Sequence, residues 1–266
     1  MIQKKLHGYR YQGGDEPLQP CTAAARALAT HCSEMARRIS TLAMLTASAL
    51  VARAQPVILM IGDSSGSYGG LSLEDFCDGA TVVNQAIGGT TTSDWGRAEI
   101  ASAFQGGCRY THVWIGIGGN DLLNSAGCSL SKATLKQRLQ TVVNNVKQFK
   151  PAGAKMIATG YCTPTGETDN CGDPTVSNSV LNGAWADVAA TEPELTFVSS
   201  ANACGAERPG DWSPGTHHVD VIHFNNRGYC KVWTAPTLQA ELGCCAKEYT
   251  CATVPLAIGF SSNSSN

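Results

Sequence analysis

Five short apolar runs alternate with segments of helical character, and this alternation limits the possible folds more than any other feature. The runs cover residues 57–61, 81–86, 111–117, 155–160 and 195–198. Short runs rich in Val, Ile and Leu are typical of strands buried on both faces of a parallel sheet. Strands that alternate with helices are joined by right-handed crossovers, which place helices on both faces. We therefore predict an α/β fold, a three-layer sandwich around a five-stranded parallel sheet.

The clearest predicted helix follows Ser131, which can cap its first turn, and ends at Pro151. Its apolar residues share one face at helical spacing, and they are Leu135, Leu139, Val142, Val143, Val146 and Phe149. We interpret this stripe as core, because a surface helix buries one apolar face. Further helices are predicted over residues 71–77, 91–104, 176–188 and 225–242.

Residues 35–54 have the layout of a secretory signal peptide. Two arginines precede an apolar stretch that is too short to span a membrane, and Ala52-Arg53-Ala54 supplies a small-x-small end. We predict that the signal peptide starts at Met35 and that residues 1–34 are a disordered upstream segment or presequence. An N-terminal helix of the domain is the alternative. One domain is expected over residues 55–245, followed by a C-terminal tail over residues 246–266.

The part of the chain after the predicted signal peptide is acidic. Residues 1–54 hold seven of the 19 Lys and Arg and three of the 21 Asp and Glu, which leaves a net charge of −6 on the remainder. This charge disfavours nucleic acid as a partner. We expect no membrane span and a monomer.

Ten of the twelve cysteines follow Ala54, which predicts disulfides in an exported chain. Zinc binding is the competing interpretation, but the sequence has no CxxC pair, and adjacent Cys244 and Cys245 are poorly spaced for one ion. The spacing of the cysteines does not determine their pairing. We favour a bond between Cys162 and Cys171, which would close one loop.

Polar residues follow the predicted strands where their carboxyl ends meet, at the edge where open α/β sheets bind ligands. Ser64 alone could simply cap a helix. Serine becomes a nucleophile when a base such as His223 takes its proton, and Asp220 could orient that imidazole. Donors such as the Asn120 side chain and the N–H groups of Gly88 and Gly89 could stabilise an oxyanion. Together these residue types predict an acyl-transfer site.

The same residues lie in four blocks that resemble those of the SGNH (GDSL-type) hydrolase family, over most of residues 57–240. The blocks are Gly62-Asp63-Ser64, residues 84–91, Gly118-Gly119-Asn120-Asp121 and Asp220-x-x-His223. The resemblance implies a flavodoxin-like sheet with Ser64 as nucleophile, His223 as base and Asp220 as its partner. It also implies an oxyanion hole made by the Ser64 and Gly89 N–H groups and the Asn120 side chain. It implies no cofactor and no metal.

Several residues near these blocks allow other interpretations. Ser65 stands where the family has leucine, so packing beside the nucleophile is expected to differ. We interpret Asp63 and Asp121 as structural residues. Trp212 precedes the last block and is a candidate contact for an acyl group or a sugar, whereas the other tryptophans are assigned to the core.

A metal site formed by His217, His218, Asp220 and His223 is a further alternative. It is disfavoured because adjacent residues rarely converge on one ion.

The sequence thus predicts a secreted serine esterase that acts through an acyl-enzyme on a small-molecule or glycan ester. Short acyl groups, such as acetyl on carbohydrate, are favoured because the acidic domain lacks a broad apolar lid segment. Lipase-like activity and acyl transfer in the same fold stay open. A non-catalytic, cysteine-rich secreted binding protein is the alternative of another class.

Overall fold

The computed structural model describes residues 55–67, 73–106, 109–162, 174–199, 217–218, 223–244 and 251–253. The predicted upstream segment and signal peptide, residues 1–54, lie outside these ranges. So does most of the predicted tail. The described ranges hold most of the predicted domain.

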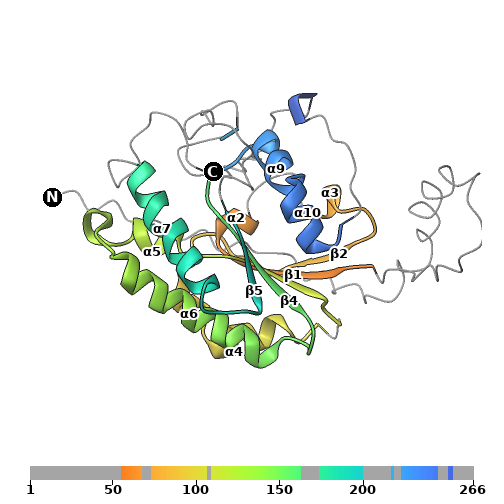
Figure 1. Ribbon diagram of the computed structural model, residues 1–266, viewed down its shortest axis with the longest axis horizontal. Coiled ribbons are helices and arrows are strands. Elements are labelled where there is room, and N and C mark those ends of the chain that lie inside the picture. Colours follow the sequence, from red (N-terminus) through yellow and green to blue (C-terminus); the bar gives the residue numbers. More distant parts are fainter. Residues whose placement is uncertain are drawn as a thin grey trace, which may run out of the picture.

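The centre of the molecule is a five-stranded sheet in which all neighbouring strands are parallel (Figure 1). Its strands are β1 (Val57–Gly62), β2 (Thr81–Asn84), β3 (His112–Gly116), β4 (Lys155–Thr159) and β5 (Leu195–Val198). The spatial order is β2-β1-β3-β4-β5, which confirms the predicted parallel sheet. The chain leaves β1 toward β2 and returns to the other side of β1, so the loops after β1 and β3 diverge. Ligands of doubly wound sheets bind at this switch point.

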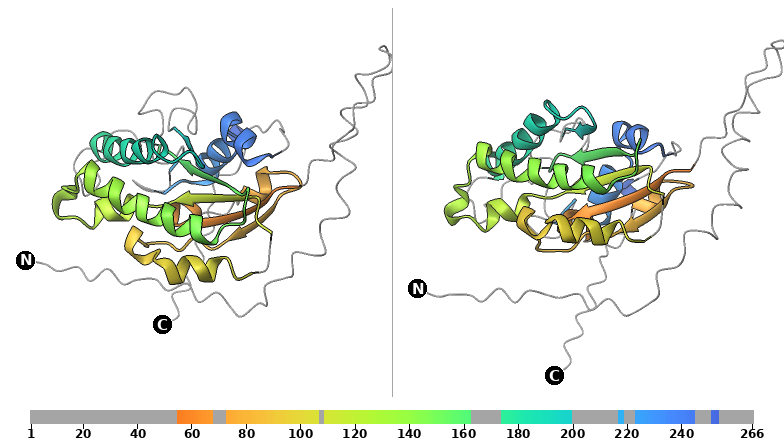
Figure 2. Two further views of the ribbon diagram at one scale, coloured as in Figure 1. Left: turned by 60° about the horizontal axis from the view of Figure 1, so that its bottom comes forward. Right: turned by 90° about the horizontal axis from the view of Figure 1, so that it is seen from below.

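Helices cover both faces of the sheet, which gives the predicted three layers (Figures 1 and 2). One face carries α4 (Arg97–Ala103), α6 (Lys132–Phe149) and α7 (Pro174–Ala189). The other face carries α3 (Leu73–Phe76), α9 (Asn226–Trp233) and α10 (Pro236–Leu242). Two short helices, α2 (Ser64–Ser67) and α5 (Gly119–Leu123), follow β1 and β3. Within the described ranges, no helix has both the length and the hydropathy needed to cross a bilayer.

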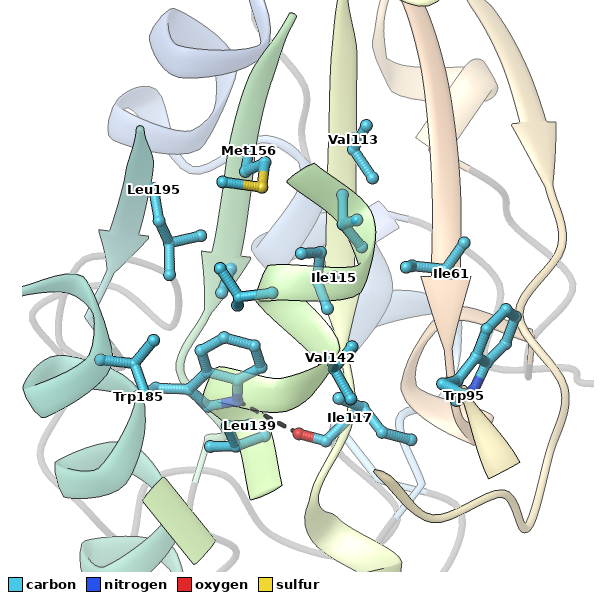
Figure 3. Packing of buried hydrophobic residues seen from close by; sticks show 14 of the residues in the cluster. Ile61, Trp95, Val113, Ile115, Ile117, Leu139, Val142, Met156, Trp185 and Leu195 are labelled. Carbon is cyan, nitrogen blue, oxygen red and sulfur yellow. Dashed lines mark hydrogen bonds between the residues drawn. The ribbon is translucent and has the colours of Figure 1, made fainter. Parts of the chain in front are cut away.

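Alternate residues of each strand point into the two cores, as strand geometry requires. On β3, Val113 and Ile115 belong to the core beneath α6, whereas Trp114 belongs to the core beneath α9. The predicted stripe of α6 is buried in the first of these cores, and the Ser131 hydroxyl accepts a hydrogen bond from Thr134 N as its cap. Figure 3 shows this core, including the hydrogen bond of 3.1 Å from the Trp185 indole to the carbonyl of Ile117.

Two helix predictions are wrong in their extent, and a third is described only in part. The helix predicted over residues 91–104 is a 3-10 turn, η2 (Thr92–Asp94), followed by α4, because Gly96 is extended at the junction. The helix predicted over residues 225–242 is divided into α9 and α10. Pro236 explains this break, because it has no N–H to donate and begins the second helix. The helix predicted over residues 71–77 is described only as α3.

Disulfides join the elements on the α9 face of the sheet. Two are described in full, and they are Cys77–Cys244 and Cys230–Cys251. The first connects the end of α3 to the end of α10, and the second connects α9 to η4 (Cys251–Thr253). These bonds confirm the disulfide interpretation for four cysteines. Cys162 is also disulfide-bonded, but its predicted partner Cys171 lies outside the described residues.

Candidate active site

A tight turn at the end of β1 presents Ser64. Gly62 has a φ of 138°, and a Cβ there would overlap the carbonyl of Gly116 on β3, so this position requires glycine. Asp63 N then donates to Gly116 O over 2.8 Å, and Ser65 N donates to Asp63 Oδ1 over 2.8 Å. The residues before and after Ser64 are therefore both fixed by hydrogen bonds where α2 begins.

His223 meets Ser64 although 159 positions separate them in the sequence. The distance between His223 Nε2 and Ser64 Oγ is 3.1 Å, which is hydrogen-bonding range for a base and its nucleophile. His223 precedes α9, whose first N–H groups donate to the side chain of Asn225. From the same helix, Tyr229 Oη donates to Ser64 O over 3.2 Å. The start of α9 thus binds to the serine turn at two points.

Asn120 lies in the first turn of α5. Its Nδ2 donates to Thr90 O over 2.9 Å, which connects the turn after β3 to the turn after β2. Thr90 in turn donates from its hydroxyl to Gly62 O over 3.1 Å. The turns that follow β1, β2 and β3 are therefore joined around Ser64.

The glycines after β2 form the third side of this arrangement. A Cβ on Gly88 would lie 3.8 Å from Ser64 Cβ, so the backbone passes close to the serine turn. Gly89 has a φ of 81°, and a Cβ there would meet no atom within 4 Å. The predicted donor Gly89 therefore follows Gly88, whose backbone lies near Ser64, on an exposed turn.

A buried network of side chains lies beneath the serine turn. Asp63 is 2% exposed, and Tyr161 Oη donates to its Oδ2 over 2.9 Å. The hydroxyls of Tyr161 and Ser65 are 3.3 Å apart. Burial raises the pKa of Asp63, while the hydrogen bonds from Ser65 and Tyr161 and the charge of His223 act in the opposite direction. Asp63 is therefore a buried carboxyl close to the candidate base.

Tyr161 is held in place by Asn182 of α7. Tyr161 N donates to Asn182 Oδ1 over 2.8 Å, and Asn182 Nδ2 donates back to Tyr161 O over 3.0 Å. A Cβ on Gly119 would lie 3.4 Å from the Tyr161 ring. Burial, followed by the charge of Asp63, holds the pKa of Tyr161 well above its usual range, so its hydroxyl stays protonated and can donate. A Cβ on Gly119 would also lie 3.6 Å from Asp63 Oδ2, so Tyr161, Asp63 and the start of α5 pack together.

A pocket opens above these groups. The described residues that line it come from the turns after β1, β3 and β4 and from the start of α9, and they are Asp63, Ser64, Ser65, Gly119, Asn120, Leu123, Tyr161, His223, Phe224 and Tyr229. Ser64, Asn120 and His223 therefore share one cavity at the switch point of the sheet.

Comparison with known families decides the relationship. The family described as GDSL-like lipase/acylhydrolase matches residues 59–230, which is more than half of the chain. The chain belongs to the GDSL-like lipase/acylhydrolase family. This membership confirms the resemblance found in the sequence, and it identifies the protein as an ester-hydrolysing enzyme. Among curated proteins, no significant match is found.

Solved structures with the GDSL fold resemble the chain at low sequence identity. A lipase/acylhydrolase from Enterococcus faecalis is 18% identical, with a TM-score of 0.51 over 73% of this chain and 100% of its own. A catalytic mutant of an acetylxylan esterase from Geobacillus stearothermophilus is 19% identical, with a TM-score of 0.53 over 73% and 97%. A carbohydrate acetylesterase from Sinorhizobium meliloti is 14% identical, with a TM-score of 0.50 over 71% and 99%. These similarities support the fold.

Two predicted residues of this GDSL enzyme, Asp220 and Trp212, lie outside the described residues. The alternative metal site included Asp220, so it is not described as a whole. Its other members include His218, which is buried and packs its ring 5.0 Å from that of Phe224. Within the described ranges, no group of three or more His, Cys, Asp or Glu is arranged to hold a metal.

Two residues of the GDSL enzyme have contacts that its family blocks do not indicate. Ser65, in place of leucine, brings a hydroxyl to Tyr161 and so changes the packing beside the nucleophile, as expected. Tyr161 itself was missed by sequence reasoning. Its one signal was its position just after β4, at the edge where the other site residues were sought.

Proposed function

We propose that this protein is a secreted serine esterase that hydrolyses short acyl esters, with acetyl groups on carbohydrate as the favoured substrate. The observation that carries the proposal is the 3.1 Å contact between Ser64 Oγ and His223 Nε2 inside the pocket. A hydroxyl within reach of an imidazole can lose its proton as it attacks, which is what nucleophilic catalysis by serine requires.

The proposed reaction begins when Ser64 Oγ attacks the acyl carbon and His223 Nε2 takes the serine proton. The protonated His223 then gives this proton to the leaving alcohol, and an acyl-enzyme forms on Ser64. In the second half, His223 takes a proton from water, which attacks the acyl carbon and releases the acid. Asp220 is assigned the role of orienting His223 and stabilising its positive charge.

The negative oxygen of the tetrahedral intermediate is assigned to three donors. Ser64 begins α2, so its N–H has no acceptor within the helix. Asn120 Nδ2 carries two hydrogens, and one of them is used in the bond to Thr90 O. That bond orients the amide and leaves the second hydrogen for the oxyanion. The Gly89 N–H is the third proposed donor. Each such donor contributes on the order of 3 kcal/mol to transition-state stabilisation.

The preference for a short acyl group on a water-soluble alcohol is supported by the described surface. Among the described residues, Ile87 is the one large hydrophobic side chain that is clearly exposed. Enzymes that bind lipid surfaces expose broad apolar patches. The described ranges offer no such patch. Two of the similar solved structures are, by their titles, carbohydrate-directed acetyl esterases. Secretion is supported by the described disulfides, which form in oxidising compartments.

The test compares the protein with a Ser64→Ala variant on p-nitrophenyl acetate and with a fluorophosphonate probe. We expect kcat/KM to fall by about 10⁴-fold or more and labelling to disappear, because the acyl-enzyme and the probe adduct both form on Ser64 Oγ. Ser67→Ala is the matched control, since it removes an exposed hydroxyl from the same helix and should change neither readout. A wild-type protein that neither turns over the ester nor labels would favour the non-catalytic binding protein.

Secretion is tested separately. The chain beginning at Met35 is expressed with its leader, and the exported product is analysed by mass spectrometry. We expect a mature N-terminus at Gln55. A product that stays in the cell with residues 35–54 attached would contradict the predicted signal peptide.

A further inference from the structure

A second cavity lies directly behind the active-site pocket. The described residues that line it are Ser65, Trp114, Thr159, Gly160, Tyr161, Phe224, Val232 and Trp233. Ser65, Tyr161 and Phe224 line both spaces, so these three residues form the wall between them. We call this wall the partition and the space behind it the inner cavity.

We propose that the partition determines acyl-chain length, because it ends the active-site pocket just beyond an acetyl group and closes the apolar inner cavity to longer chains. This inference rests on the proposed esterase function and adds to it the residues that select the substrate.

The geometry of the intermediate indicates why the acyl chain would face the partition. The acyl carbon is bonded to Ser64 Oγ, its negative oxygen faces the donors near Asn120, and the leaving oxygen faces His223. One direction remains for the acyl chain. Besides Asn120, His223 and their chain neighbours, the described residues that line the pocket include Ser65 and Tyr161, in the turns after β1 and β4.

The partition is held by contacts on both of its sides, so it behaves as a fixed wall. Tyr161 is bound through its hydroxyl to Asp63 and through its backbone to Asn182. The ring of Phe224 packs edge-on against that of Tyr229, with 5.4 Å between their centroids. A side chain with contacts of this kind does not swing aside without breaking them.

The inner cavity has the chemistry to accept hydrocarbon once it is opened. Three of its walls are the side chains of Trp114, Val232 and Trp233, which are almost fully buried in the core beneath α9. Burying one methylene group improves binding about fourfold. Two additional methylenes, as in a butanoyl group, are therefore expected to gain about tenfold or more when the two spaces are joined.

The test opens the partition at Phe224. Wild type, Phe224→Ala and the milder Phe224→Leu are assayed on p-nitrophenyl acetate, butanoate and hexanoate, and their folding is checked by circular dichroism. We expect wild type to prefer acetate at least about tenfold in kcat/KM. The ratio of butanoate to acetate activity should rise about tenfold in Phe224→Ala and less in Phe224→Leu.

Two controls show whether the route runs through the inner cavity. Leu123→Ala removes a similar volume from a pocket wall that the inner cavity does not share, and it should leave the ratio unchanged. In the Phe224→Ala background, Val232→Phe refills the inner cavity from behind and should cancel the gain.

Three results would overturn the inference. The first is a wild-type enzyme that accepts hexanoate as well as acetate. The second is an unchanged butanoate-to-acetate ratio in folded Phe224 variants that still turn over acetate and label at Ser64, which would leave the proposed esterase function intact. The third is a wild-type protein that hydrolyses none of the three esters, which would overturn the esterase proposal as well.

Discussion

Asp63 and Asp121 occupy similar places in the fold but have different partners. Each follows a central strand, near the start of a short helix, and they are 2% and 3% exposed. Asp121 accepts hydrogen bonds from Thr92 N at 2.8 Å and Thr92 Oγ1 at 2.6 Å, and it pairs with Arg138 at 3.0 Å. Asp63 accepts from Ser65 N and Tyr161 Oη, both neutral groups.

The difference in partners indicates that the two buried carboxyls have different roles. Asp121 is compensated by a cation and connects η2 to α6, so its removal would leave buried partners without an acceptor. Asp63 has no Lys or Arg partner among the described residues, and the charge that acts on it is that of His223. We infer that Asp63 contributes to the reaction by stabilising the positive charge that His223 acquires, and that Asp121 contributes to stability.

The largest expected effect is the loss of stability in Asp121→Ala. The substitution leaves the buried N–H and hydroxyl of Thr92 without their acceptor, and we expect the free energy of unfolding to fall by about 3 kcal/mol. Urea denaturation measures this change. Arg138→Gln is the comparison, because it keeps the bonds to Thr92 and removes only the cation that pairs with Asp121, so its loss measures the ion pair. Equal losses in the two variants would show that the bonds to Thr92 contribute little.

The next effect is a loss of activity without a loss of stability in Asp63→Asn. Asparagine keeps the shape of the side chain and an acceptor for Ser65 N, but it removes the negative charge near His223. We expect kcat for p-nitrophenyl acetate to fall about tenfold, which corresponds to about 1.4 kcal/mol. The free energy of unfolding should stay constant or rise by up to about 1 kcal/mol, because a buried uncompensated charge is removed.

Tyr161→Phe separates charge from hydrogen bonding in this network. The variant keeps the Asp63 carboxylate and removes one bond to it, so its kcat should fall less than that of Asp63→Asn. If Asp63→Asn retains the wild-type kcat, Asp63 acts only on the local backbone.

The strand-end residues could be predicted from sequence because parallel strands direct their carboxyl ends to one edge of the sheet. A single rule therefore brought Ser64 and Asn120 together before any contact was known. The local bond from Ser65 N to Asp63 was also within reach, since Asp commonly binds the backbone two residues on. Pro236 and Gly96 were visible signals for the two helix breaks.

Contacts between distant residues could not be predicted in the same way. Tyr161 binds Asp63 across 98 positions, and no periodicity or motif encodes that pairing. Gly116 had no visible pattern either, and although Gly62 belongs to the first block, the reason that it must be glycine arises only when β1 and β3 approach each other. The partition beside Ser65 depends on the same long-range packing.

The smallest expected effect is a pH dependence that distinguishes Asp63 from a stabilising carboxyl. Burial raises the pKa of Asp63 above its ordinary value of 3.8, so the folded protein binds this proton more readily than the unfolded chain. The contribution of Asp63 to stability therefore falls as the pH rises from 3.8 through the folded pKa, with a slope below about 1.4 kcal/mol per pH unit.

Urea denaturation of wild type and Asp63→Asn at about pH 4, 5.5 and 7 should show the variant gaining stability over wild type as the pH rises. For Ser67→Ala the difference from wild type should stay constant. If Asp63→Asn instead loses stability relative to wild type as the pH rises, the bonds from Ser65 and Tyr161 outweigh burial. Asp63 would then stabilise the fold as Asp121 does.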